Sequence, residues 1–219
     1  MNGYLPEDIP AAEVEREERL YAPFTHAVRE LVDATIRTEA DEAEVRAAQA
    51  EIEAITARLR RRQLDGSYGV RLRPDGNNRA WGNAVIGVRN PVAPPLRIEH
   101  DGHGRVWSDF RLGAAYEGPP TLVHGGVSAL ILDQLLGQAA GSGGRPGMTG
   151  TLTVRYRKPT PLGDLRGEAW IDRSEGVKTW ARGHLIGPDG VTVEGEGVFI
   201  LPRWARERLA AKPAPQYFE

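Results

Sequence analysis

The chain contains no cysteine. This absence excludes a disulfide scaffold, catalysis by a thiol and any metal site that depends on cysteine ligands. Long apolar runs are also missing, since no stretch approaches the roughly 20 residues that a membrane-spanning helix needs. The N-terminus shows no basic segment followed by an apolar run, so we expect neither a signal peptide nor a membrane span. A soluble cytoplasmic protein is the simplest interpretation.

A strong charge of one sign is the third feature that the chain lacks. The net charge is −2, distributed as −6 over residues 1–65 and +4 over residues 66–219. A nucleic-acid-binding domain would carry a much more basic face, so we expect no nucleic-acid partner. The mild positive balance of the second segment would suit a small phosphate-bearing ligand, but ordinary surface variation is the simpler explanation.

The first part of the chain predicts helices. At 219 residues with 40% hydrophobic content, the chain is long enough for one domain with an extension. Thr38 and Asp41 resemble a capping box that would open a second helix. That second helix has a narrow apolar seam at alternating spacings of three and four residues, which suits packing on another helix, including one from a second subunit. The seam consists of Val45, Ala48, Ile52, Ile55 and Leu59.

The remainder predicts an antiparallel sheet around one apolar helix. Residues 66–78 are rich in Gly, Pro, Asp and Asn and read as a linker. Apolar and polar residues alternate along residues 152–157, a pattern typical of a half-buried strand. The apolar positions are Leu152, Val154 and Tyr156, and the polar positions are Thr153, Arg155 and Arg157. We therefore predict an N-terminal helical extension over 1–65, a linker over 66–78, the main domain over 79–202 and a C-terminal tail over 203–219. The expected strands cover residues 85–88, 106–112, 149–157, 165–173, 177–187 and 191–201.

Asp133 is the most unusual residue of the expected helix. Apolar side chains cover nearly every face of residues 122–137, so the helix should be buried. A lone buried carboxylate costs several kcal/mol unless it has a partner or a shifted pKa. A structural Asp with hydrogen-bond donors and a functional Asp are equally good interpretations at this point.

The helix opens with His124, Gly125 and Gly126. Bare backbone N–H groups at the positive end of a helix can stabilise an oxyanion or bind a phosphate. A tight turn that requires glycine is the structural alternative, and His124 is as easily a packed histidine as a catalytic one. Nine residues separate His124 from Asp133, which is 2.5 turns or roughly 13 Å, so a site using both needs an extended substrate or a second chain.

Other groups are weaker candidates. His100, Asp101 and His103 could bind a metal in principle, but their glycine spacing favours a hairpin turn. Three cations cluster near the end of one expected strand, where a solvated edge is the usual interpretation. They are Arg155, Arg157 and Lys158.

Taken in order, these motifs resemble the hotdog-fold acyl-CoA thioesterases, with the closest likeness to the branch of the phenylacetic-acid-pathway thioesterase. The resemblance covers about residues 100–202 and leaves the N-terminal helices outside. The residues that carry it are Tyr116-Glu117-Gly118-Pro119-Pro120, His124-Gly125-Gly126, Asp133, Met148-Thr149, Tyr156-Arg157-Lys158-Pro159 and Pro161-Leu162.

The resemblance implies a fold and a set of roles. The fold would be an α+β hotdog, a curved antiparallel sheet wrapped around a long central helix. Asp133 would be the general base or the nucleophile, and the Gly125 N–H, with that of Gly126, would polarise the thioester carbonyl. Thr149 would hold the water or the carboxylate, and His124 would support the turn or the substrate. The phosphates of coenzyme A would face Arg155, Arg157 and Lys158.

The resemblance also implies partners. We expect an acyl-CoA substrate, no metal or redox cofactor, and a homodimer or dimer of dimers with sites at subunit interfaces. A hotdog hydratase and a non-catalytic acyl-CoA-binding scaffold remain the alternatives.

Overall fold

A computed structural model describes residues 4–74, 78–142, 147–203 and 205–206. The chain divides into two compact units, Met1–Ala93 and Pro94–Glu219. The predicted division of the chain at the linker 66–78 stays a prediction. Within the described residues, no helix combines the length and the apolar character needed to cross a membrane.

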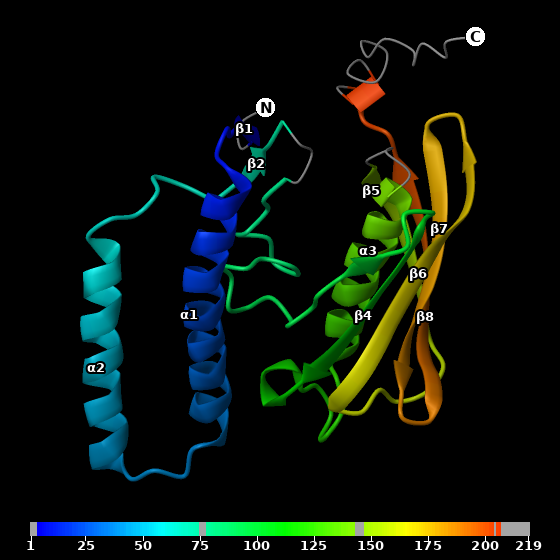
Figure 1. Cartoon of the computed structure of the whole chain (residues 1–219). Helices are drawn as coiled ribbons and strands as arrows, with labels where there is room; N and C mark the ends of the chain where they lie inside the picture. Colours follow the sequence, from blue (N-terminus) through cyan, green and yellow to red (C-terminus); the bar gives the residue numbers. More distant parts are fainter. Residues whose placement is uncertain (1–3, 75–77, 143–146, 204, 207–219) are drawn as a thin grey trace. The chain divides into compact units, whose positions relative to one another are not determined.

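The first unit contains the predicted helices and a small parallel sheet (Figure 1). Residues 11–63 were expected to be helical, and they form α1 (Ala11–Arg37) and α2 (Glu42–Arg60). Strands β1 (Tyr4–Pro6) and β2 (Val70–Leu72) pair in parallel.

The capping box predicted for Thr38 and Asp41 is wrong. Asp41 itself is the N-cap of α2, because its side chain accepts a hydrogen bond from the Glu44 N–H at 2.9 Å. Thr38 instead closes α1 in an extended conformation, with its N–H donating to the Ala34 carbonyl. The N-cap is thus Asp41 and not Thr38, and its side chain accepts from the backbone N–H at the N3 position, Glu44.

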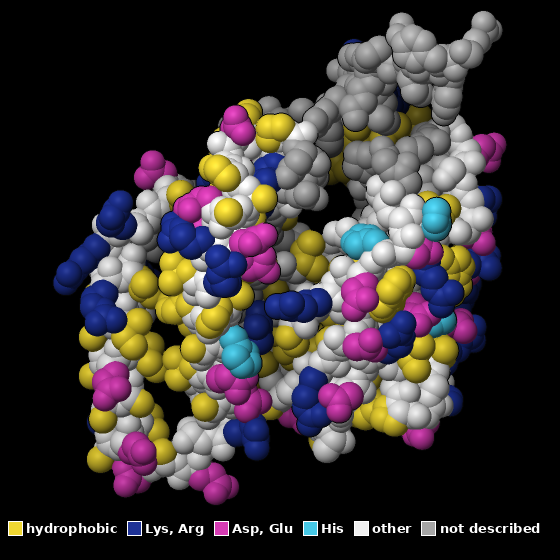
Figure 2. All heavy atoms as spheres, viewed as in Figure 1, with side chains coloured by type: hydrophobic (Ala, Val, Ile, Leu, Met, Phe, Trp, Pro, Cys, Tyr) yellow, Lys and Arg dark blue, Asp and Glu magenta, His cyan; other side chains and the backbone are white. Residues whose placement is uncertain are grey.

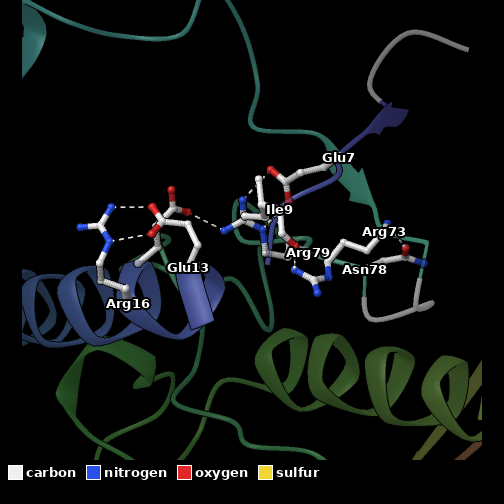
Figure 3. Close-up of polar contacts among 8 residues, drawn as sticks. Glu7, Ile9, Glu13, Arg16, Arg73, Asn78 and Arg79 are labelled. Carbon is white, nitrogen blue, oxygen red and sulfur yellow. Dashed lines mark hydrogen bonds and ion pairs between the residues drawn. The ribbon is translucent and has the colours of Figure 1, made fainter. Parts of the chain in front are cut away.

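Polar and aromatic contacts hold the first unit together. Arg79 is 5% exposed and forms ion pairs with Glu7 at 2.5 Å and Glu17 at 2.6 Å (Figure 3 shows the Glu7 side). Its guanidinium also lies 4.3 Å from the centre of the Trp81 ring. Burial pulls the Arg79 pKa down, but the hydrogen bonds to Glu7 and Glu17 outweigh it and raise the pKa above its ordinary value.

The strand predicted at residues 85–88 is wrong, because this segment folds as consecutive turns. The Asn83 side chain accepts hydrogen bonds from the N–H groups of Val85 at 2.7 Å and Ile86 at 3.1 Å. The Gly87 N–H donates to the Asn83 carbonyl. An asparagine that satisfies the backbone locally competes with strand pairing, and the apolar run was too short to overcome it.

The second unit is a six-stranded antiparallel sheet with one long helix, α3 (Gly125–Ser142). The strand order is β3-β4-β6-β7-β8-β5, and every pairing is antiparallel. The five long strands confirm those predicted from residue 106 onward to within two residues at each end. The strands are β3 (Glu99–His100), β4 (Arg105–Leu112), β5 (Met148–Tyr156), β6 (Gly163–Glu175), β7 (Lys178–Gly187) and β8 (Gly190–Ile200), and a 3-10 turn, η1 (Ala114–Tyr116), follows β4.

The predicted hairpin turn after His100 is present in this unit. The hairpin at residues 100–104 is closed by Asp101, whose side chain accepts from the His103 N–H at 2.7 Å and the Arg105 N–H at 3.0 Å. These bonds hold the Asp101 pKa below its usual value. Gly190, with a φ of +96°, turns the chain from β7 into β8. The glycine-rich residues 141–144 were expected to form a loop, but Gly141 and Ser142 belong to α3, and residues 143–144 lie outside the described part of the chain.

Helix α3 packs against β4, β5, β6, β7 and β8, and the sheet wraps around it (Figure 1). Ile131, Leu132, Leu135 and Leu136 of α3 are fully buried in the core. Two sheet glycines permit this close approach. A side chain at Gly167 would come within 2.5 Å of Leu135 Cδ1, and one at Gly195 within 3.3 Å of Leu136 Cδ1.

We expect Arg79→Met to destabilise the first unit by about 3 kcal/mol, since it strands two largely buried carboxylates without their cation. Amide hydrogen exchange over residues 4–37 and 68–93 would measure the loss as faster exchange. The control is Arg16→Met, because Arg16 pairs with Glu13 on the surface, where both side chains are well exposed (Figure 3). Equal protection in the two variants would contradict a stabilising role for Arg79.

Candidate active site

Asp133 is half-buried on α3 and has a defined partner. The Thr149 hydroxyl donates to Asp133 Oδ1 at 2.9 Å. The two residues come from different elements, α3 and the edge strand β5, which lie against each other. The expectation that α3 is buried on nearly every face is wrong for one chain. Leu130, three residues before Asp133, is 40% exposed. Apolar residues on this outer side explain why the sequence pattern predicted burial, but among the described residues of the second unit Leu130 is not covered.

A β-bulge aims Thr149 at the helix. Leu152 and Val154 face α3 and pack on its core, so simple alternation would turn Thr149 to the opposite side. The pairing of β5 with β8 shifts by one residue between Thr149 and Thr151, which aligns Thr149 with the buried Phe199. Because directly paired residues share a face of the sheet, Thr149 points toward α3 and reaches Asp133.

The turn at the start of α3 is held by two side chains. His124 Nδ1 accepts from the Gly126 N–H at 2.9 Å, and the Tyr156 hydroxyl donates to the Gly125 carbonyl at 2.8 Å. The peptide that links Gly125 to Gly126 is therefore fixed at its N–H and at its C=O. With Nδ1 accepting, neutral His124 carries its proton on Nε2.

The two glycine N–H groups are not equivalent. The Gly126 N–H is taken up by His124. Within the described part of the chain, no hydrogen bond uses the Gly125 N–H, which leaves it as a donor at the positive end of α3. The predicted pair of oxyanion donors thus reduces to one available N–H in this structure.

A cavity of about 380 Å³ adjoins this turn. Gly125 and the buried Ser128 of α3 line it on one side, and Tyr156 on the other. Arg157 and Lys158 also line the cavity, whereas Asp133, Thr149 and Arg155 do not. One chain therefore holds two separate halves of the expected site, with about 12 Å of helix between Gly125 and Asp133.

The three predicted phosphate ligands differ in their surroundings. Arg155 projects from β5 on the face away from α3, and Arg157 directly follows the strand. They form ion pairs across to β8 with Glu196 at 3.2 Å and Glu194 at 2.7 Å, respectively. Lys158 Nζ donates to the Asp189 carbonyl at 2.9 Å. No group of three or more metal-binding side chains occurs among the described residues.

Tyr156 is a site residue that sequence reasoning left without a role. It pairs with Val193 on the helix-facing side of β5, which places its hydroxyl beside Gly125. The alternation of β5 was the sequence feature that indicated its position. Tyr156 follows Leu152 and Val154 on the face that packs on the helix, so its side chain was expected to face the helix too.

Comparisons with known proteins agree with this geometry. The family model of the thioesterase superfamily matches residues 121–193. A thioesterase superfamily protein of known crystal structure is 34% identical, covers 90% of this chain and 98% of its own, and superposes with a TM-score of 0.73. A match over 90% of the chain includes part of residues 1–65, so at least part of the helical extension is shared with that protein.

Two further structures are more distant. Zebrafish thioesterase superfamily member 2 is 17% identical over 49% of this chain and 81% of its own, with a TM-score of 0.46. A phenylacetic acid degradation-related protein from Ralstonia eutropha is 21% identical over 49% of this chain and 83% of its own, with a TM-score of 0.44. Neither is similar enough to support an argument about this chain.

The predicted hotdog fold is confirmed by the central helix in its antiparallel sheet together with the match to the nearly full-length relative. Identity of 34% across 98% of that relative, with the family model falling on the segment that contains Gly125 and Asp133, shows that this chain belongs to the thioesterase superfamily.

Proposed function

We propose that this protein hydrolyses acyl-CoA thioesters to the free carboxylic acid and coenzyme A. The observation that carries the proposal is the hydrogen bond from Thr149 to Asp133, which fixes a half-buried carboxylate in a known orientation. Membership of the thioesterase superfamily supports the reaction class.

Asp133 is the reacting group in this proposal. As a general base it takes a proton from water, whose oxygen attacks the thioester carbonyl; as a nucleophile its own oxygen attacks, and water then cleaves the resulting anhydride. In both routes the C–S bond breaks, the thiolate leaves with a proton, and one water is consumed. Thr149 donates to one carboxylate oxygen, which leaves the other free to act.

The Gly125 N–H stabilises the oxyanion that develops on the carbonyl. A preorganised donor at a helix N-terminus is worth more in the transition state than in the ground state. His124 and Tyr156 are positioning residues in this proposal, because the polar atoms of their side chains fix the peptide between Gly125 and Gly126.

The cavity beside Gly125 is the proposed entry for coenzyme A. Lys158 and Arg157 are the cationic residues of its lining. Arg157 is already paired with Glu194, so its contribution to phosphate binding competes with that ion pair. Arg155, paired with Glu196 and away from the cavity lining, keeps its predicted role without a supporting contact.

Two copies of the chain would complete the site. Asp133 and Gly125 lie about 12 Å apart along one helix, too far to act on the same carbonyl. Strand β5 ends the sheet with a free edge, and Met148 on it is 65% exposed. A free, nine-residue edge strand is unfavourable for an isolated chain, and pairing with a second copy would cover it. Such a homodimer could place Asp133 of one chain opposite Gly125 of the other.

The first prediction concerns the carboxylate. Asp133→Asn should lower turnover about 100-fold or more, since asparagine can neither accept the proton nor attack the carbonyl. Release of free coenzyme A thiol from a panel of acyl-CoAs measures it. Asp164→Asn, which alters an exposed carboxylate on β6, is the matched control and should remain active.

The same assay separates the alternatives. A chain that binds acyl-CoA without releasing thiol would be a binding protein, and hydration of crotonyl-CoA would indicate a hotdog hydratase. Normal thiol release by Asp133→Asn would contradict the assignment of Asp133.

The second prediction concerns Tyr156. Tyr156→Phe keeps the ring in the cavity wall but removes the hydrogen bond to Gly125, so kcat should fall about fivefold while KM changes little. Tyr68→Phe, a hydroxyl deletion in the first unit, is the control. A Tyr156→Phe effect confined to KM would show that the hydroxyl binds substrate instead of holding the turn.

The third prediction tests whether the site is shared. Gly125→Pro removes the proposed donor, and proline is tolerated at the first position of a helix. It should be as inactive as Asp133→Asn. After mixing and subunit exchange, the two variants should regain about a quarter of wild-type activity, because half of the dimers are mixed and each contains one intact site. No recovery despite proven exchange would place the site within a single chain.

A further inference from the structure

Helix α2 has an apolar seam that no part of the described chain covers. Val45 is 47% exposed, Ile52 37%, Ile55 46% and Leu59 52%, and α2 has no buried residue (Figure 2). The spacing of these residues is that of a helix-helix contact. Isolated exposed side chains are ordinary, but a continuous stripe along one helix indicates a partner.

Charges beside the seam indicate which partner fits. Glu44, Glu51 and Arg58 each precede a seam residue and lie seven residues apart, so all three flank the same side of the seam. The helix is acidic in its first turn and carries four arginines at its end, Arg58, Arg60, Arg61 and Arg62. A helix with this distribution is complementary to a reversed copy of itself.

We propose that α2 pairs antiparallel with α2 of a second copy of this chain. Reversing one helix brings the same flank of both together, and one register places each Glu51 opposite Arg58 of the other copy. In that register Ile52 packs on Ile55 and Ala48 on Leu59, twice each by symmetry. A parallel pair would instead set the flanking charges against Gln49 and Thr56, with no ion pair gained.

The seam is short, and this suits pairing between chains that are already associated. Two heptads bind weakly when free, but linkage to another contact raises their effective concentration. The inference is independent of thioesterase activity, since no residue of α2 belongs to the proposed active site.

Thiol cross-linking of the full-length protein tests the pairing, since the natural chain has no cysteine. In the proposed register, Ile52→Cys places its two thiols about 5 Å apart along the helix axis, and Val45→Cys about 25 Å apart. A short bismaleimide should therefore join Ile52→Cys into a covalent dimer and leave Val45→Cys mainly single. Equal cross-linking of both variants would mean a parallel pair, and cross-linking of neither would mean that α2 does not pair; either result overturns the proposal.

Charge reversal in the Ile52→Cys background tests the register. Glu51→Arg should lower the cross-linking yield by about fivefold, which is what two exposed ion pairs of ordinary strength contribute. Adding Arg58→Glu exchanges the two charges and should restore the yield. A double variant no better than Glu51→Arg would overturn the proposed pairing of these residues. Far-UV circular dichroism of each variant, measured in parallel, shows whether α2 stays helical.

Discussion

The close contact between α3 and the sheet is the constraint on which the second unit depends. The buried leucines of α3 can reach the strands because Gly167 and Gly195 leave room beneath Leu135 and Leu136. A side chain at Gly167 would collide with Leu135 Cδ1, so this part of the core would have to rearrange around α3. Gly125 at its start and Asp133 near its middle are therefore placed by core packing and not by their own polar contacts.

Strand β5 contacts α3 at the two residues of the proposed active site, Gly125 and Asp133. On the helix-facing side of β5, Tyr156 lies beside the first turn of α3. Near the start of the strand, the bulge after Thr149 turns the Thr149 side chain to this same side. One hydroxyl then holds the Gly125 peptide while the other holds the Asp133 carboxylate. A one-residue slip of β5 would break both contacts, since it would turn each side chain to the opposite face. The bulge thus determines the position of Thr149 in the proposed active site.

Regular apolar spacing was sufficient to predict α1, α2 and the long strands, and a continuous apolar run was sufficient to predict α3, although α2 buries none of its residues. Periodicity failed where a local hydrogen bond decided the structure, as at Asn83, whose side chain ties residues 85–86 into a turn. Periodicity also did not predict the contact between Thr149 and Asp133, since simple alternation points the Thr149 side chain away from α3. Only the family resemblance suggested that contact. Gly150, inside the strand at the bulge, was the sequence sign of the exception. The roles of His124 and Tyr156 in fixing one peptide depend on three-dimensional contacts that no spacing reveals.

Both units leave apolar surface uncovered in a single copy, and the reason differs between them. The first unit is held together around Arg79 by its contacts with Glu7, Glu17 and Trp81. Because α2 has no buried residue, it contributes nothing to that core, and its seam stays exposed. The second unit has a full core, yet Leu130 and Met148 stay exposed beside Asp133 and Thr149. Exposed apolar residues next to Asp133 are costly for an isolated chain and useful for one whose proposed site is completed by a second copy. The two surfaces lie on separate units, so disrupting the α2 seam and disrupting the β5 edge should have separable effects, the first on cross-linking and the second on turnover.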